Sequence, residues 1–530
     1  MTVKVLLFDG KVVEVLGRIQ HAAKNIAFGY IGNITSTVLG FVLRTVFIMK
    51  LDETLLGING LYTGILTMLS LAELGIGTAL NYSLYAPVAK KDYEKIKSYM
   101  LFYKKAYRAI AGVVACIGLL LVPFLKYFIK NPGNYGIQEL TVYYLIFLFN
   151  TVSTYFVAYK YSLVNAEQKN YIQTNVLTLT KLATTVLQLI VLLLTSNFLL
   201  YLLTAAAVEL IQKIYVNYYL NKRYPYLKDK DVKPLGTEET AEIVNKTKAL
   251  VFHKVGDVAR LQTDSIIISS FIRVSLVGIV DNYTMVINSI SGFVNIIFNS
   301  VISSFGNLIA TESKEKQYEI FKVYRFVANW IYGLSAIGFF VLLSPLIYLW
   351  LGEEWMLSSS VIALVLIDYY FKGDRIVLSN FKTAAGVFEQ DKYLALIQGV
   401  VNLVISIVLV QYIGLAGVYI GTIISGLIAN ITKPFIIYKV CFDKKVREYF
   451  KDTVKQLVIM AVILVIVLPI SKVLLTDITI ITFVIVGVMI VGIYNIVFLI
   501  VFRKTEEFGY LWGIVKGKLE RWYCFYKGGK

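Results

Sequence analysis

Charged residues are scarce in this chain. They make up 16% of its 530 residues, whereas apolar residues make up 57%, and the mean hydropathy is +0.69. A soluble protein of this length carries roughly a quarter charged residues, because polar groups must cover its surface. The composition therefore excludes an ordinary soluble protein and predicts an integral membrane protein.

Cysteine and histidine are also rare. The three cysteines, Cys116, Cys441 and Cys524, are far apart and show no CxxC spacing, so neither a disulfide framework nor a zinc site is expected. The two histidines, His21 and His253, argue against a histidine-dependent membrane enzyme. No P-loop, HExxH, GxSxG or acidic metal cluster is present. We therefore expect no enzyme activity, no bound metal and no cofactor.

Long apolar runs recur along the whole chain, each about 20 residues and so long enough to cross a ~30 Å hydrocarbon core. Runs such as VLQLIVLLLT are continuously apolar, which is typical of membrane helices rather than of a membrane β-barrel. We predict an all-α membrane protein with about fourteen transmembrane helices. The expected spans are 26–50, 55–86, 106–129, 138–163, 171–195, 198–220, 248–271, 275–309, 323–350, 358–387, 393–412, 415–438, 455–474 and 478–502.

Lysine and arginine are unevenly distributed between the connecting segments. The 87–105, 221–247 and 439–455 connections and the C-terminal tail are basic and fall on one side of the predicted membrane, whereas the opposite turns are short. Cytoplasmic loops carry this excess, so both termini are predicted to be cytoplasmic. The same loops account for the net charge of +18, and no nucleic-acid partner is expected.

The 221–247 segment is the longest polar connection and divides six spans from the next six. The predicted organisation is a cytoplasmic amphipathic segment at 1–25, a first lobe at 26–220, a cytoplasmic linker at 221–247, a second lobe at 248–440, two further spans in 441–503 and a basic cytoplasmic tail at 504–530.

A weak internal repeat supports this division. Gly57-Ile58 is followed by Tyr62-Thr63 in span two, and Gly278-Ile279 is followed by Tyr283-Thr284 at the same spacing in span eight. These spans are an even number apart, so the two halves would share one orientation. The pattern predicts a parallel repeat about an axis along the membrane normal, an arrangement known among secondary transporters.

Charged residues in the first lobe's spans each need a partner or a function, because a charge near the bilayer centre costs at least ~2.5–3.5 kcal/mol. Lys181 and Glu209 lie in spans joined by a tight turn and fall at similar depth. They are predicted to form a structural ion pair, with a transport role as the alternative.

Arg44 has no acid at matching depth in span two, so we expect it to face an anion or a wet cavity, or else a distant structural partner. A guanidinium suits phosphate.

The second lobe's spans carry two further charged groups. Lys254, Asp257, Arg260 and Asp264 share one face of span seven, either as a self-paired ladder or as a polar stripe between the lobes. Asp368, Lys372, Asp374 and Arg375 flank Gly373 in span ten, which predicts a broken or cavity-lining segment.

Four segments resemble parts of a known family. They are GFVLR at 40–44, LAELGIG at 71–77, QTDSIIISSF at 262–271 and AAGVFEQDKYLALIQGVVNLVISIVLVQYIGLAGVYIGTIIS at 384–425. In order and spacing they resemble the bacterial polysaccharide flippases, which are O-antigen and capsule exporters of the MATE-like flippase superfamily. The resemblance covers nearly the whole chain, including the span count.

The resemblance implies two six-helix lobes around a central cavity that opens alternately to each side of the bacterial cytoplasmic membrane. It implies a flippase that moves an undecaprenyl diphosphate-linked oligosaccharide repeat unit, with polysaccharide-assembly proteins as partners. Arg44 matches an arginine of the first helix in such flippases and would contact the diphosphate. The residues expected to make the cavity attractive to anions are Arg44, Lys254, Arg260, Lys372 and Arg375. Glu73 or Asp264 would couple transport to an ion gradient.

Three alternatives stay open. A multidrug exporter or a lipid II flippase of the same superfamily would share the fold, although an exporter of cations should favour an acidic cavity. A membrane-embedded glycan polymerase or ligase would typically need a large outward loop, and the outward turns here are short.

Overall fold

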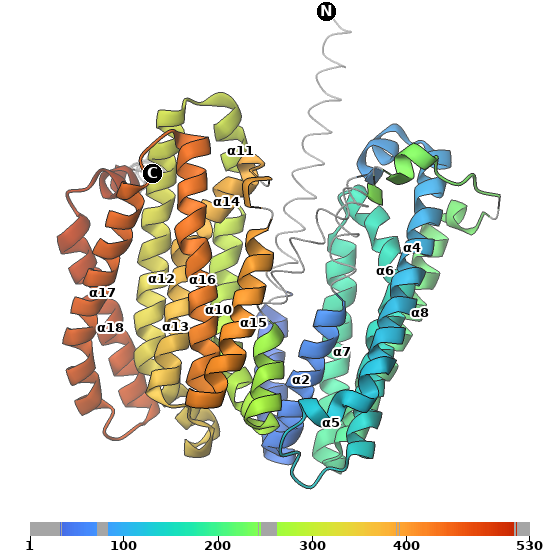
Figure 1. Cartoon of the computed structure of the whole chain (residues 1–530), viewed down its shortest axis with the longest axis horizontal. Helices are drawn as coiled ribbons and strands as arrows, with labels where there is room; N and C mark the ends of the chain where they lie inside the picture. The colour runs from blue at the N-terminus through green and yellow to red at the C-terminus, as the bar shows by residue number, and fades with distance from the viewer. Residues whose placement is uncertain are drawn as a thin grey trace, which may run out of the picture. The chain divides into compact units, whose positions relative to one another are not determined.

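The computed structural model describes residues 32, 34–70, 83–229, 231–241, 243–244, 262–387, 389–391, 393–513 and 516. The described segments are helices joined by turns and loops, and no strand occurs among them. By its contacts the chain divides into two compact units, Met1–Gly278 and Ile279–Lys530. Figure 1 shows that within each unit the long helices run side by side.

The first unit is built on long packed helices. They are α2 (Glu53–Leu69), α4 (Tyr93–Leu121), α5 (Leu125–Phe128), α6 (Ile137–Ala166), α7 (Tyr171–Thr195) and α8 (Phe198–Arg223), together with helices at 34–50, 83–90 and 262–271. Helix α6 packs between α4 and α8, and α7 packs against α8. The Asp52, Asp92 and Asn197 side chains cap the first turns of α2, α4 and α8, each accepting a hydrogen bond from a backbone N–H.

The second unit is built around α12 (Lys314–Leu351). Its other helices are α10 (Val274–Asn299), which begins in the first unit, α11 (Ile302–Thr311), α13 (Ser359–Asp374), α14 (Ile376–Ala385), α15 (Leu394–Ile413), α16 (Leu415–Ile437), α17 (Arg447–Leu474) and α18 (Ile480–Phe502). Helix α12 contacts α13, α14, α17 and α18. Buried apolar residues such as Ile337, Ile463 and Ile490 join α12, α17 and α18 into one core.

Ten helices of the described chain are long and apolar enough to cross a membrane, and each coincides with a predicted span. Three more predicted spans overlap the helices at 34–50, 53–69 and 262–271. Residues 26–31, 71–82 and 248–261 of these spans lie outside the described residues. The tenth predicted span, 358–387, is interrupted at Arg375 between α13 and α14. This break confirms the interruption predicted beside Gly373.

Alternate connections of the first unit lie at opposite ends. At one end, the Lys97 ammonium at the start of α4 lies 3.1 Å from the Asp229 carboxylate in the segment after α8. At the other end, the Tyr135 hydroxyl donates to the Asp52 carboxylate at 2.7 Å and so joins the turn before α2 to the turn before α6. The basic 87–105 and 221–247 connections therefore share one end of the unit.

Residues 262–278, which follow the predicted linker, belong to the first unit by their contacts. The backbone N–H of Lys130 donates to the Ser269 carbonyl, and the N–H of Val274 donates to the Lys130 carbonyl, both at 3.1 Å. In addition, Arg273 lies 3.3 Å from Glu53. These bonds explain why the division by contacts falls at Gly278 rather than within 221–247.

The tyrosines of the weak sequence repeat make matching contacts. The Tyr62 hydroxyl donates to the Leu140 carbonyl at the start of α6, at 2.8 Å. The Tyr283 hydroxyl accepts a hydrogen bond from the Leu357 N–H just before α13, also at 2.8 Å. In each case a residue of one span holds the beginning of the helix two spans later. The corresponding positions of these contacts support the parallel internal repeat, although one tyrosine donates and the other accepts.

Candidate functional site

The first unit contains a cavity of about 820 Å³ between helix 34–50, α2, α4, α6, α7 and α8. Most of its lining side chains are polar: Asn59, Thr63, Tyr107, Thr154, Tyr161, Ser162, Asn165, Gln173, Thr180, Lys181, Thr184, Gln188, Tyr201, Glu209, Gln212 and Lys213. Polar side chains inside a membrane-spanning unit are costly unless they face water or a polar ligand. We refer to this space as the N-unit cavity.

Three charged side chains line the N-unit cavity. The Glu209 carboxylate lies 3.5 Å from the ammonium of Lys213, one turn later on α8. Lys213 is buried and also donates to the Asn150 carbonyl at 2.9 Å and to the Ser153 hydroxyl at 2.8 Å. Lys181 lies on α7, where its side chain is exposed and the charge of Glu209 acts on it.

Glu209 thus pairs with Lys213, which was not predicted, and its charge also acts on Lys181. Residues four apart on one helix are immediate neighbours, so Lys213 is nearer than a residue on the adjacent helix. Lys181 and Glu209 line the same cavity, and their predicted structural pair stays a prediction. The pairing of Glu209 with Lys213 leaves Lys181 as the accessible positive charge of the α7 wall.

Arg44 lies beside the N-unit cavity. The preceding residue, Leu43, lines the cavity, and the charge of Arg44 acts on both Lys181 and Tyr201. Arg44 itself is half-buried. With Lys213 offsetting Glu209, the cationic groups Arg44 and Lys181 give this region a net positive charge, which attracts anions.

An aromatic cluster stands at the end of the cavity nearest the α7–α8 turn. The Phe47 ring centre lies 5.8 Å from that of Phe198 and 5.3 Å from that of Tyr201, and Tyr143 packs on Phe198 at 4.9 Å. Three of these pairs meet edge to face, a favourable geometry for aromatic rings. The cluster holds helix 34–50, which carries Arg44, against α6 and α8.

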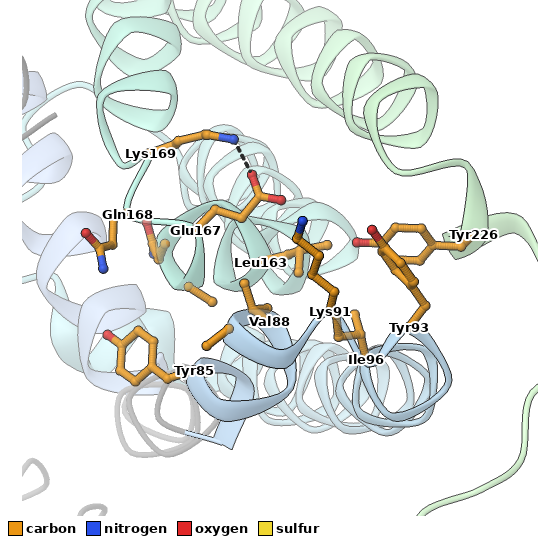
Figure 2. A pocket seen from close by; sticks show the side chains of 13 residues that line it. Tyr85, Val88, Lys91, Tyr93, Ile96, Leu163, Glu167, Gln168, Lys169 and Tyr226 are labelled. Carbon is orange, nitrogen blue, oxygen red and sulfur yellow. Dashed lines mark hydrogen bonds and ion pairs between the residues drawn. The ribbon is translucent and has the colours of Figure 1, made fainter. Parts of the chain in front are cut away.

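A second recess, of about 830 Å³, lies where α4 begins and α6 ends (Figure 2). In it the Glu167 carboxylate accepts hydrogen bonds from Lys169 at 2.9 Å and from Tyr224 at 3.0 Å. Burial and the nearby Glu167 charge raise the pKa of Tyr226, so its hydroxyl stays protonated at neutral pH and can donate. Asn165 lines both this recess and the N-unit cavity.

In the second unit, the predicted cavity cations Lys372 and Arg375 form an ion pair and hydrogen bonds within the unit. Lys372 lies 2.6 Å from Asp368, one turn earlier on α13. Arg375 is buried at the α13–α14 break and donates to the Gly426 carbonyl at 3.1 Å and to the side chain of Asn430. These contacts give both residues a structural role, and their predicted part in an anion-attracting cavity remains a prediction.

A buried charge network in the second unit was not predicted from the sequence. Arg325 of α12 lies 3.1 Å from Asp374, which also accepts hydrogen bonds from the Tyr449 hydroxyl at 2.9 Å and the Thr453 hydroxyl at 3.1 Å. The guanidinium carbon of Arg325 lies 3.6 Å from the centre of the Tyr449 ring. The available signal was an arginine just inside the predicted 323–350 span. The network ties α12, α13 and α17 together.

Four further residues were predicted from the sequence as cavity cations or ion-coupling carboxylates. Glu73, Lys254 and Arg260 lie outside the described residues. Asp264 is half-buried in helix 262–271, which packs on α2 near Gly64. Ion coupling through Glu73 or Asp264 therefore remains a prediction.

The family model described as "Polysaccharide biosynthesis protein" matches residues 22–303. No curated protein matches the sequence. Among solved structures, the chain is similar to the lipid II flippase MurJ in an inward closed conformation, with a TM-score of 0.64, 16% identity, and 90% of this chain and 99% of that chain covered.

Two MATE transporters have related folds. One is a multidrug resistance MATE family transporter of the MOP superfamily in an inward-facing conformation, with a TM-score of 0.59, 15% identity, and coverage of 78% and 96%. Another is the Vibrio cholerae MATE transporter VcmN, with a TM-score of 0.52, 16% identity, and coverage of 82% and 99%. These likenesses establish the fold of a multi-pass, all-helical membrane protein. Because the family model matches more than half of the sequence, the chain belongs to the polysaccharide biosynthesis protein family.

Proposed function

We propose that this protein is a flippase that moves an oligosaccharide repeat unit, linked to undecaprenyl diphosphate, from the inner to the outer leaflet of the bacterial cytoplasmic membrane. Transport would proceed by alternating access and supply surface polysaccharide synthesis. Family membership and a fold similar to those of a lipid flippase and of MATE transporters support the proposal. The observation that carries it is the cationic, amide-rich N-unit cavity.

The residues around the cavity match the chemistry of this cargo. Arg44 presents a planar fork of donors that suits the oxygens of a diphosphate, and Lys181 adds an accessible point charge. The side-chain amides of Asn59, Gln173 and Gln212 offer both donors and acceptors for sugar hydroxyls. Lys254, Arg260, Lys372 and Arg375 belong to the proposal as further cations, and Glu73 or Asp264 as the ion-coupling carboxylate.

Substitution of the two cavity cations tests the proposal. Arg44→Gln and Lys181→Gln, each produced in a cell whose surface polysaccharide depends on this protein, are expected to lower the surface polysaccharide about tenfold, because each removes a charge-assisted contact. The control is Lys222→Gln, which removes an exposed lysine of α8 that does not line the cavity. Unchanged polysaccharide at equal protein level in both cavity variants would remove these residues from the mechanism.

A lipid II flippase is the second candidate, favoured by the similarity to MurJ. Its cargo would carry the same lipid diphosphate as the proposed oligosaccharide cargo but a different sugar. Rescue of a cell depleted of its own lipid II flippase would favour this candidate, and failure of that rescue together with restored surface polysaccharide would favour the first. A drug exporter is less consistent with the cavity, because its one lining carboxylate, Glu209, is paired with Lys213.

A further inference from the structure

A basic groove of about 810 Å³ runs over α4, α6, α8 and the short 3-10 helix Pro225–Lys228. Its charged lining residues are Lys104, Arg108, Lys160, Lys213, Lys228 and Asp229. Five cations thus line the groove with one carboxylate. Asp229 lies 3.1 Å from Lys97, a cation outside the lining, so its charge is already shared. The groove therefore carries a strong excess of positive charge.

Lys160 gives the groove a buried cation. Its side chain, near the end of α6, belongs to a residue that is only 4% exposed. The ammonium donates to the side-chain oxygens of Asn217 and of Asn221, the latter at 2.6 Å. These acceptors from α8 are neutral amides, which orient the ammonium without cancelling its charge. A buried charge held in this way favours an anion beside it.

Exposed apolar side chains line the same groove. Phe156 of α6 and Leu210 and Ile214 of α8 are exposed in the isolated chain. On the membrane-facing surface of a helical unit, such side chains contact lipid acyl chains. The groove therefore combines a cationic part with an apolar part, which suits an amphiphile with an anionic head. Its cationic part includes Lys228 of the basic 221–247 connection, so it lies at the end of the unit predicted to be cytoplasmic.

We propose that this α4–α6–α8 groove binds the phosphate headgroup of an anionic membrane phospholipid, with an acyl chain along Phe156 and Ile214. The proposal rests on the groove alone and does not require the proposed cargo. Lys213 lines both the groove and the N-unit cavity, where it pairs with Glu209. A bound phosphate would compete with Glu209 for Lys213, so occupancy of the groove would alter the charge of the cavity.

Lipid binding to the purified full chain tests this proposal. A fluorescent phosphatidylglycerol is titrated into the detergent-solubilised protein, with phosphatidylcholine as the neutral comparison. The double variant Lys104→Gln/Arg108→Gln is expected to weaken phosphatidylglycerol binding about tenfold or more, and Lys160→Gln about fivefold, since each basic residue near the membrane surface contributes roughly 1 kcal/mol. The control Lys105→Gln alters the adjacent exposed lysine of α4, which does not line the groove, and should change affinity less than twofold.

Three outcomes would overturn the proposal. Affinity unchanged in the double variant, or lowered equally by Lys105→Gln, would show that the groove is not the site. Complete displacement of the lipid by millimolar inorganic phosphate would assign the groove to a soluble phosphate compound instead. The double variant changes only exposed or half-buried side chains, so its binding result stands even where Lys160→Gln does not fold.

Discussion

At the scale of single residues, charges inside the helices serve two different ends. Arg325 and Asp374 are buried together and held by further hydrogen bonds, so they join helices. Lys181 instead lines a cavity with its side chain exposed. The distinction depends on neighbours from other helices, and it decides whether a substitution should change stability or transport.

Asp374→Ala is expected to destabilise the protein. It removes the buried carboxylate at 3.1 Å from the Arg325 guanidinium and leaves only the more exposed Asp452 carboxylate at 3.5 Å. Removing one partner of a buried pair typically costs about 3–5 kcal/mol. The unfolding midpoint of the purified protein in detergent should fall clearly. The control, Lys316→Gln, breaks an exposed pair with Glu319 on the same α12 and should leave the midpoint unchanged. Equal midpoints for Asp374→Ala and the wild type would show that the network does not hold the helices together.

The candidate site could be predicted from the sequence only in part. Arg44, Lys181 and Glu209 stand out as charges within apolar runs, and the structure places all three in or beside one cavity. Lys213 was missed although it follows Glu209 by one helical turn, a spacing that signals a pair within one helix. The proposed role of Lys160 could not be read from the sequence, because it depends on two asparagines of α8.

At the scale of helices, close packing sets limits that composition does not reveal. Helix α2 approaches the start of α10 so closely at Gly57 that a Cβ atom there would lie 1.9 Å from the Val274 carbonyl oxygen. At Gly64, two turns along the same helix, the nearest atom to such a Cβ is 3.7 Å away. The repeat glycine Gly57 therefore marks a contact of backbone with backbone.

Gly57→Ala is expected to disrupt this contact, because the obstructing atoms belong to the backbone and cannot rotate away. Overpacking of this kind costs about 1–3 kcal/mol or more. Gly64→Ala should be neutral or slightly stabilising, because alanine favours a helix over glycine by roughly 1 kcal/mol. Unfolding midpoints of both variants measure the difference. A Gly57→Ala protein as stable as Gly64→Ala would mean that α2 and α10 are not in close contact.

Helix positions were predicted well, since a run of about 20 apolar residues has few alternatives in a membrane. The break between α13 and α14 was also predicted, on the strength of Gly373 and four nearby charges. What the sequence did not reveal is why Gly373 is there. A Cβ at this position would lie 2.1 Å from the ring of Tyr332, so glycine admits α12 to close contact. The need for glycine at this position depends on Tyr332, a residue 41 positions earlier in the sequence.

At the scale of the whole molecule, each unit contains a tyrosine that hydrogen-bonds to the backbone at a corresponding position. Tyr62 and Tyr283 each bond to the backbone at the start of the helix two spans later. The sequence showed the repeat only as four matching letters. The hydrogen bonds explain those letters, since a tyrosine contact with the backbone at a corresponding helix start in each unit requires the same spacing, although Tyr62 donates and Tyr283 accepts.

The predicted orientation can be tested by cysteine labelling in a chain whose Cys116, Cys441 and Cys524 are replaced by serine. Lys91→Cys and Asn134→Cys place single exposed cysteines at opposite ends of the first unit. A membrane-impermeant maleimide added to intact cells is expected to label Asn134→Cys at once and Lys91→Cys only after permeabilisation. The reverse pattern would invert the orientation derived from lysine and arginine.

Helices α17 and α18 determine what a truncated form of the protein would lose. Tyr449 and Thr453 of α17 supply hydrogen bonds to Asp374, and α17 and α18 cover apolar residues of α12. A stop codon shortly after Phe442 would therefore expose an apolar face of α12 and strip the Arg325–Asp374 pair of its support. Nonsense alleles between Phe442 and Tyr449 should behave as complete losses, although every residue of the N-unit cavity would still be encoded.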